Sequence, residues 1–432
     1  MNMIRTNNHS SVSKVAEIEE LLIEILLRVP PKPLTKFKCV SKQWLSLISD
    51  SKFCHSYARI SPKFSLLVDD DMFCSKFQVI PLNPPTRIVN NIVVRDFLKI
   101  YGHAKIVQSC NGLLLCQSSF LSNPHTDDFT FDGHLRCVAY IVCNPTTGQL
   151  RRIVCPSSLS PPSSPNPNLK YSDALFSVCL GFNPRISNHY KVIFIFDWDW
   201  DLCVKKHPTH KPFEIFIYSS ETQSWSWHRI EAVDYGTKLM RNNNNPFCFN
   251  DAIHWVRYRS LDHTGIVLRF DSDTIVFKTI NVPYFNFLGF GEYRENLQMI
   301  TREGDYSSLK FNIWEVASDY SKVSIRYSID LESVKRVHPD WNFSPSSIFS
   351  IICGEDIKDT TFVISVENMA VSYNHSDGTF EMICDVEQRP QDLNFNSLVP
   401  CVSSYPYHDY AYRDPVASYY RAFQFFESYY CV

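Results

Sequence analysis

The chain has 432 residues, of which 44% are hydrophobic and 20% are charged, and its formal net charge is −3. This composition is typical of a folded protein with a sizeable core, arranged as one large domain or two to three ordinary ones. Because the charge is nearly balanced, the chain as a whole gives no indication of a nucleic-acid partner or of a membrane surface.

The N-terminal segment, residues 1–16, lacks the apolar run that a secretory signal needs, so we expect a disordered extension and no export. No stretch approaches 18 consecutive apolar residues, which argues against a membrane-spanning helix. We therefore expect the protein in the cytoplasm, the nucleus or both. Its 15 cysteines should then be reduced and serve mainly as small core residues.

Residues 17–58 follow a helical pattern in two stripes. Acidic residues stand in the first turn of the first stripe, and Pro30 and Pro31 end it. The apolar residues of the first stripe recur at the spacing of one helix face and are Ile18, Leu21, Leu22, Ile25, Leu26 and Val29. The second stripe follows Pro33 and consists of Leu34, Phe37, Val40, Trp44, Leu45, Leu47 and Ile48. This pattern predicts three or four short helices.

A unit of this size cannot bury its apolar stripes alone, because about 40 residues are too few for an independent core. Either the rest of the chain or another protein must cover them. Between Arg28 and Lys63 there are eight basic residues against one acidic residue, Asp50. This local excess, with Trp44 as an anchor, favours an acidic protein partner. Two alternatives remain open, a nucleic-acid partner, and a solvated basic face on a helical unit that packs against the rest of the chain.

Residues 64–404 read as short apolar strands separated by turn residues, with no long amphipathic helix between them. One unit recurs, an apolar strand, a polar tight turn and a second strand. The residues directly before the turns are Cys143, Tyr218, Phe270, Val316 and Tyr373, at intervals of 75, 52, 46 and 57 residues. Four-stranded propeller blades repeat about every 40–50 residues, or more with long loops. The sequence therefore predicts a degenerate six- or seven-bladed β-propeller, with a large β-sandwich or two β-domains as the alternative.

Three further segments stand apart from these strands. The stretches 158–168 and 241–246 are rich in Pro, Ser and Asn and are expected to be loops on one rim. The tail, residues 405–432, is rich in tyrosine. Within the tail, one helix face could form that docks on the propeller or binds a partner, consisting of Val416, Tyr420, Phe423 and Tyr430.

No catalytic or metal-binding pattern assembles along the chain. Asp197, Asp199 and Asp201 resemble the start of a calcium loop, but the later positions that need Gly and an acid hold Leu202 and Pro208. No C-x-x-C pair and no nucleotide-binding or hydrolase motif occurs. We expect no cofactor, no metal and no catalytic residue, although carboxylates scattered around a propeller channel could still form an enzyme site.

The helical stretch resembles an F-box, the motif by which substrate receptors dock on the Skp-type adaptor of a cullin–RING ubiquitin ligase. The similarity is carried by LLIEILLRVP (21–30), Leu34, FKCVSKQW (37–44) and LI (47–48). Further segments are similar to the F-box-associated, kelch-like region of plant F-box proteins. They are CNGLLLC (110–116), NPTTGQL (144–150), VCLGFNPRISNHYKVI (178–193), FEIFIYSSETQSW (213–225) and IHWV (253–256). The family usually opens its first helix with Leu-Pro, and this chain has Glu17-Ile18 instead.

The resemblance implies a non-catalytic substrate-recognition subunit of a Skp–cullin–F-box ubiquitin ligase. It implies that the adaptor links the chain to the cullin and RING subunits, while the β-domain recruits an unknown target protein. By the same resemblance, the residues that contact the adaptor are Ile18, Leu21, Leu26, Pro30, Leu34, Val40 and Trp44. Two alternatives are a propeller binding protein with a vestigial F-box, which the altered Glu17-Ile18 opening suggests, and a pollen S-locus type F-box protein.

Overall fold

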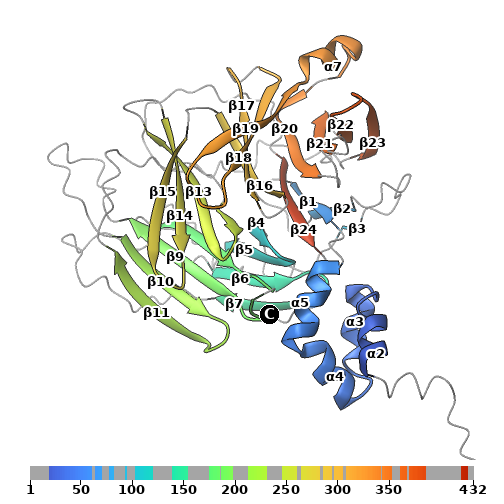
Figure 1. The fold of residues 1–432 in the computed structure, drawn as a ribbon, viewed down its shortest axis with the longest axis vertical. Helices are drawn as coiled ribbons and strands as arrows, with labels where there is room; N and C mark the ends of the chain where they lie inside the picture. Colours follow the sequence, from blue (N-terminus) through green and yellow to red (C-terminus); the bar gives the residue numbers. More distant parts are fainter. Residues whose placement is uncertain are drawn as a thin grey trace, which may run out of the picture.

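The computed structural model has a small helical region followed by a large β-structure (Figure 1). It describes residues 19–60, 64–70, 77–81, 93–94, 103–119, 139–153, 175–184, 186–197, 213–230, 246–259, 264–282, 286–293, 296–304, 308–341, 343–352, 361–366, 369–385 and 420–426. Among these residues, none of the helices is long and apolar enough to cross a membrane.

Within residues 19–60 the structure has four short helices, which agrees with the predicted three or four. They are α2 (Glu19–Leu26), α3 (Pro31–Phe37), α4 (Lys42–Ser49) and α5 (Ser51–Ile60). Helix α3 begins at Pro31. The N–H of the first helical residue has no partner within the helix, so a proline there loses no helical hydrogen bond. Helix α4 is capped by Ser41, whose Oγ accepts the N–H of Trp44 at 3.1 Å. The Oδ1 of Asp50 accepts the N–H of Lys52 at 2.8 Å at the start of α5.

The β-structure consists of six antiparallel sheets of four strands each, within the described residues. The first sheet contains β1 (Phe64–Asp70), β2 (Phe77–Pro81), β3 (Val93–Val94) and β24 (Tyr420–Phe426). The next two contain β4 (His103–Cys110), β5 (Leu113–Ser119), β6 (Ala139–Asn144) and β7 (Gln149–Ile153), and then β8 (Leu175–Gly181), β9 (Lys191–Asp197), β10 (Phe213–Ser219) and β11 (Ser224–Ile230).

The remaining three sheets follow in chain order. They contain β12 (Phe247–Phe249), β13 (Ala252–Arg259), β14 (Thr264–Asp271) and β15 (Val276–Val282), then β16 (Asn286–Tyr293), β17 (Asn296–Arg302), β18 (Lys310–Val316) and β19 (Val323–Asp330), and finally β20 (Phe343–Ile352), β21 (Thr361–Val366), β22 (Met369–Asn374) and β23 (Phe380–Asp385). Helix α7 (Glu332–Val337) connects β19 to β20.

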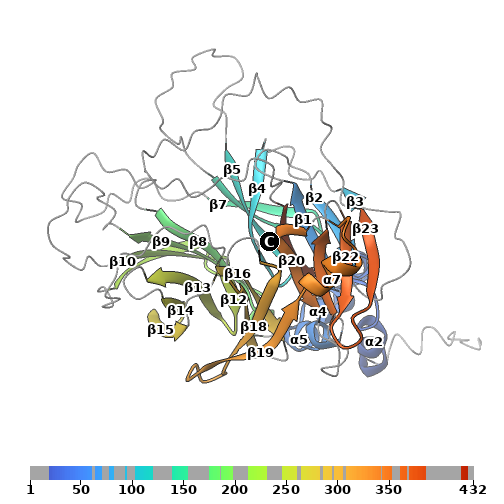
Figure 2. The same cartoon turned by 90° about the horizontal axis from the view of Figure 1, so that it is seen from above.

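The six sheets form the blades of a β-propeller (Figure 2). In five of the six sheets the strands follow chain order by antiparallel pairing and the first strand lies innermost, whereas in the first blade β24 takes the innermost place beside β1. Strand β24 lies beside β4 and β20, β4 lies beside β8, and β16 lies beside β20. Apolar clusters join the other neighbouring blades, from β8–β11 to β12–β15 and on to β16–β19. The propeller prediction is therefore confirmed, at the lower of the two expected blade numbers.

The segment predicted as a tail helix contains a strand instead. Strand β24 pairs antiparallel with β1 over its whole length, from Phe64 opposite Phe426 to Asp70 opposite Tyr420. Without β24, the backbone N–H and C=O groups on the inner edge of β1 would be unpaired. Residues 420–426 pair with them as a strand, which a helix could not do. The predicted helix face is wrong at Tyr420 and Phe423, and Val416 and Tyr430 lie outside the described residues. The first blade therefore combines the start of the β-region with the tail.

The recurring unit found in the sequence is the third strand, turn and fourth strand of five successive blades. Each turn places one residue in the left-handed region of backbone conformation, at Gly148, Gln223, Ile275, Tyr320 and Gly378. In three of the five, the first residue is Asn or Asp and its side chain accepts the N–H two residues on, at 2.9–3.0 Å. The predicted loop 158–168 and residues 241–245 of the predicted loop 241–246 lie outside the described residues.

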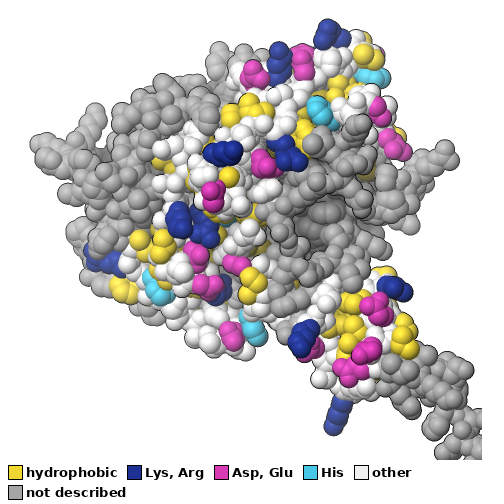
Figure 3. All heavy atoms as spheres, in the orientation of Figure 1, with side chains coloured by type: hydrophobic (Ala, Val, Ile, Leu, Met, Phe, Trp, Pro, Cys, Tyr) yellow, Lys and Arg dark blue, Asp and Glu magenta, His cyan; other side chains and the backbone are white. Residues whose placement is uncertain are grey.

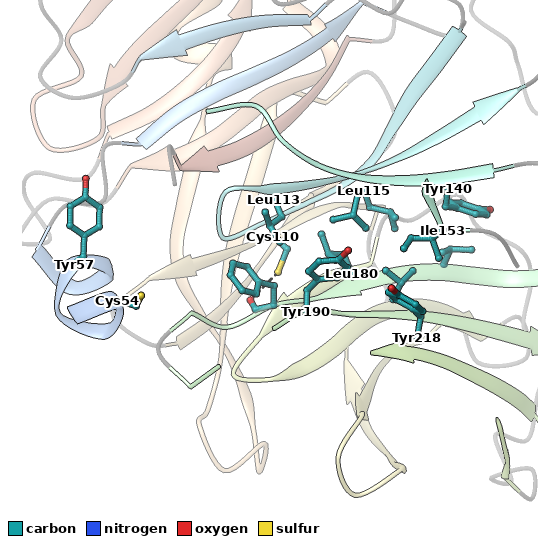
Figure 4. Close-up of a cluster of buried hydrophobic side chains, with 14 of the residues drawn as sticks. Cys54, Tyr57, Cys110, Leu113, Leu115, Tyr140, Ile153, Leu180, Tyr190 and Tyr218 are labelled. Carbon is teal, nitrogen blue, oxygen red and sulfur yellow. Dashed lines mark hydrogen bonds between the residues drawn. The ribbon is translucent and has the colours of Figure 1, made fainter. Parts of the chain in front are cut away.

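A large apolar cluster joins the second blade, the third blade and the helices. Figure 4 shows Leu113, Leu115 and Ile153 of the second blade facing Leu180 and Tyr218 of the third. A buried amide adds hydrogen bonds at the same junction, because Gln108 Nε2 donates to the Leu180 carbonyl at 2.9 Å and Gln108 Oε1 accepts the Leu180 N–H at 2.7 Å. The helical region is thus attached to the propeller through a shared core.

Candidate docking surface on the helical region

The helical region has a core of its own that is continuous with the propeller core. Its buried residues are Leu22, Leu26, Leu27, Leu34, Leu47, Ile48, Phe53, Cys54 and Tyr57. The hydroxyl of Tyr57 on α5 donates to the carbonyl of Val29 at 2.8 Å, which ties the last helix to the end of the first. The four helices are therefore held as one unit by packing within the chain.

A second set of apolar side chains on the same helices is exposed. Leu21 and Ile25 lie one turn apart on α2 with 46% and 49% of their surface exposed. Val40, between α3 and α4, is 58% exposed, and Leu45 on α4 is 47% exposed. We call these four residues the helical apolar surface. Figure 3 shows hydrophobic side chains at the surface of the helical region, with charged side chains among them.

The charges around the helical apolar surface are segregated along the chain. Exposed Glu19, Glu20 and Glu24 belong to α2. Lys36, Lys42 and Lys52 are exposed on α3, α4 and α5. Arg28 and Glu24 form one exposed ion pair of 3.4 Å, and exposed pairs of this kind stabilise a fold by about 1 kcal/mol at most. The basic excess therefore faces solvent on α3–α5, while α2 is acidic.

The residues that the sequence assigned to adaptor contact fall into three groups. Leu21, Pro30 and Val40 are exposed. Leu26 and Leu34 are 0% exposed, so their side chains belong to the core of the helical region. Trp44 is half-buried, with its ring 5.5 Å from that of Phe37 in an edge-on arrangement. Ile18 lies outside the described residues. Their role in adaptor contact stays a prediction.

Sequence reasoning missed Ile25 and Leu45 as surface residues. Both belonged to the predicted stripes but were not separated from their buried neighbours. On α2, Ile25 lies one turn from Leu21, and Leu26 lies one turn from Leu22. The apolar side of this helix is therefore wide enough to form two faces. This width was a signal that one face would be covered by the chain and the other left open.

The described residues outside the helices contain no set of three His, Cys, Asp or Glu side chains arranged to hold a metal ion. Asp199 and Asp201 lie outside the described residues. A hydrogen bond to Cys248, together with burial, raises the pKa of the Cys110 thiol well above its usual value. Burial likewise raises the pKa of Cys179, so neither thiol is an activated nucleophile.

Two family models match the chain. The F-box domain matches residues 19–56, and the F-box associated beta propeller domain matches residues 66–325. The first match coincides with the four helices that carry the helical apolar surface. The second begins in the first blade and ends within β19 of the fifth.

Curated proteins of Arabidopsis thaliana are similar over most of their length. F-box protein At5g07610 is 27% identical, with 89% of this chain and 90% of that protein covered. F-box protein At3g22700 is 25% identical, with 81% and 92% covered. Among solved structures, a chimera of ACO and RPE65 aligns over 74% of this chain and 71% of its own at 13% identity, with a TM-score of only 0.32.

Proposed function

Because the chain belongs to the family of F-box proteins with an F-box associated beta propeller domain, we propose that it is the target-recognition subunit of a Skp–cullin–F-box ubiquitin ligase. The F-box implies binding to a Skp-type adaptor. Through that adaptor the chain would be joined to the cullin and RING subunits. The propeller would hold the target protein, in the cytoplasm, the nucleus or both.

The observation that carries this proposal is the helical apolar surface. Leu21, Ile25, Val40 and Leu45 are exposed although the helices already have a complete buried core. Large apolar side chains grouped on one small region are typical of a protein-binding surface. They lie within the segment that the F-box model matches, where the adaptor would cover them.

The proposed mechanism is proximity and requires no catalytic residue in this chain. Binding a target on the propeller and the adaptor on the helices raises the target's effective concentration near the ubiquitin-loaded enzyme of the complex. Because the helices share a core with the second and third blades, the two binding regions would keep a defined relative position.

The test is the affinity of the full chain for a purified Skp-type adaptor, measured by titration calorimetry. The double variant Ile25→Ser, Leu45→Ser should bind about 30-fold more weakly, which corresponds to about 2 kcal/mol for removal of central anchors. Its unfolding midpoint should stay near that of the wild type, since both side chains are exposed. Ile186→Ser is the matched control, because Ile186 is 65% exposed on the propeller.

Two outcomes would contradict the proposal. One is a folded wild-type chain that does not bind the adaptor, which would favour a binding protein that acts outside the ligase. The other is a double variant that binds as tightly as the wild type and the Ile186→Ser control.

A further inference from the structure

A second exposed apolar region lies far from the helices, where α7 joins the fifth blade to the sixth. Figure 1 places α7 at the opposite end of the molecule's long axis from α2–α4. The helix is firmly held, because Leu331 and Val334 are buried and the Leu331 N–H donates to the Leu309 carbonyl at 3.0 Å. The Glu332 carboxylate accepts the N–H of Leu309 at 3.3 Å. Side chains that follow α7 are thus presented on a rigid base.

A row of aromatic rings leads from the blade core to this surface. The ring of Phe362, which is fully buried, lies 6.4 Å from that of Tyr373, and Tyr373 stacks on Phe380 at 4.8 Å. Trp341 meets Phe380 edge-on at 5.7 Å. His338 stacks on Trp341 at 4.2 Å with nearly parallel planes. The outer three rings are half-buried, so part of each faces solvent.

Two aliphatic side chains extend the aromatic row at the surface. Val337, at the end of α7, is 73% exposed, and Met382 on the outermost strand β23 is 54% exposed. Phe380 and Met382 lie two residues apart on β23 and so face the same side of the sheet. We define the rim patch as Val337, His338, Trp341, Phe380 and Met382. Trp and Met are among the residue types enriched where proteins bind one another.

The charges beside the rim patch indicate what it would bind. Asp330, Asp340 and Asp377 are exposed around it. Burial raises the pKa of Tyr373, and the carboxylates of Asp330 and Asp377 raise it further, so a negative field reaches the aromatic row. The basic residues of α7, Lys335 and Arg336, are exposed and lie off the buried Val334 face by the helical period.

We propose that the rim patch binds a segment of the target protein that carries basic side chains next to an apolar or aromatic anchor. The anchor would pack on Trp341, Phe380 and Met382. Lysine or arginine side chains would lie near Asp330, Asp340 and Asp377, and could also stack on the faces of the exposed rings. This inference rests on the proposed function, in which the propeller holds the target.

The test is a selection from a random dodecapeptide library displayed on phage, with the full-length chain as bait. The selected pool is depleted on the double variant Val337→Ser, Met382→Ser, so that only peptides which need the rim patch remain. These peptides should carry an excess of lysine and arginine over acidic residues and at least one large apolar residue. The strongest is then synthesised and its affinity measured by fluorescence anisotropy.

The variants separate the two parts of the proposed contact. Val337→Ser, Met382→Ser should weaken binding of the peptide at least about tenfold, as expected for lost anchors. Asp330→Asn, Asp377→Asn should weaken it about three- to tenfold and reduce its dependence on salt, because Asn keeps the local hydrogen bonds of these turns but not the charge. Ile186→Ser should bind as the wild type does.

The inference is overturned if no peptide depends on the rim patch, if the selected peptides are acidic, or if the Asp→Asn variant binds like the wild type. Adaptor binding is measured on the same preparations and should be unchanged in all rim-patch variants. A chain that binds peptides at the rim patch but not the adaptor would contradict the proposed function and leave the rim patch supported. A chain that binds the adaptor but selects no peptide that depends on the rim patch would contradict the rim-patch inference alone.

Discussion

At the scale of single residues, the fourth and fifth blades are joined by a buried histidine. His254 on β13 is fully buried, and its Nε2 lies 2.9 Å from the Tyr320 hydroxyl in the β18–β19 turn. The two rings stack at 5.7 Å, and the guanidinium of Arg269 lies 5.2 Å from the centre of the Tyr320 ring. Tyr320 adopts a left-handed backbone with φ of 62°, a strain that this junction must offset.

The burial of His254 predicts a pH dependence of stability. Burial, and to a smaller extent Arg269, lowers the pKa of His254 to about 3, whereas an unfolded histidine titrates near 6.5. Below pH ~6.5 the unfolded chain therefore takes up a proton that the folded chain does not. The free energy of unfolding should fall as the pH decreases from about 6.5 towards 3, by roughly 2 kcal/mol at pH 5 from this residue.

Urea unfolding at pH 7 and pH 5 measures this effect. His254→Gln should lack the pH-dependent part, so that its loss of stability between the two pH values is about 2 kcal/mol smaller than that of the wild type. The partly exposed His228 supplies the matched control variant His228→Gln. Equal pH dependence in wild type and His254→Gln would contradict the lowered pKa of His254 in the folded chain.

At the scale of elements, the four N-terminal helices divide their apolar residues between a core and a surface. Leu34 on α3 is fully buried, while Val40, six residues later, is 58% exposed. The same stripe in the sequence therefore contains residues that maintain the fold and residues that are open to a partner. Substitutions along it should separate into two classes.

Leu34→Ala should destabilise the helical region by about 2–5 kcal/mol, because it removes buried methyl groups and leaves a cavity. Val40→Ala should change stability by less than about 0.5 kcal/mol. Hydrogen exchange of the α2–α5 amides measures both. Adaptor affinity should fall in both variants, with faster exchange only in Leu34→Ala. Slow exchange throughout α2–α5 in Leu34→Ala would contradict the burial of this residue.

Much at this scale could be predicted from the sequence, since helices and hairpins arise from short-range patterns. The proline-bounded helices and the recurring hairpins needed only apolar periodicity and turn residues. The division between Leu26 and Ile25 could not be predicted in the same way. It depends on which side of α2 meets α3, α4 and α5, and that contact is set by residues up to 28 positions away, such as Tyr57 with Val29.

At the scale of the whole molecule, the ring of blades is closed by pairing the two ends of the β-region. Strand β24 supplies the innermost strand of the first blade and lies beside β4 and β20. Closure of this kind ties the tail to β1 across almost the whole chain. Loss of β24 would leave both the inner edge of β1 and the junctions with the second and sixth blades open.

Gln424→Pro tests this closure. Proline lacks the N–H donor and fits poorly within an interior strand, so pairing of β24 with β1 should be disrupted at Leu66. We expect a loss of about 3 kcal/mol or more in the free energy of unfolding, measured by thermal and urea denaturation. Gln424→Ala retains the donor and should stay within about 1 kcal/mol of the wild type. A proline variant as stable as the alanine variant would mean that β24 does not close the ring.

The sequence by itself determined the helical start, the repeated hairpins and the resemblance to the F-box family, because each rests on residues close together in the chain. The tertiary structure alone decided that residues 420–426 of the tail form a strand, that Leu26 and Leu34 are core while Ile25 and Leu45 are surface, and that Trp341, which follows α7, packs against Phe380 of β23. Each of these depends on contacts between residues far apart in sequence. Local preference does not fix such contacts, because they form only when closure of the ring and burial of the core select one arrangement.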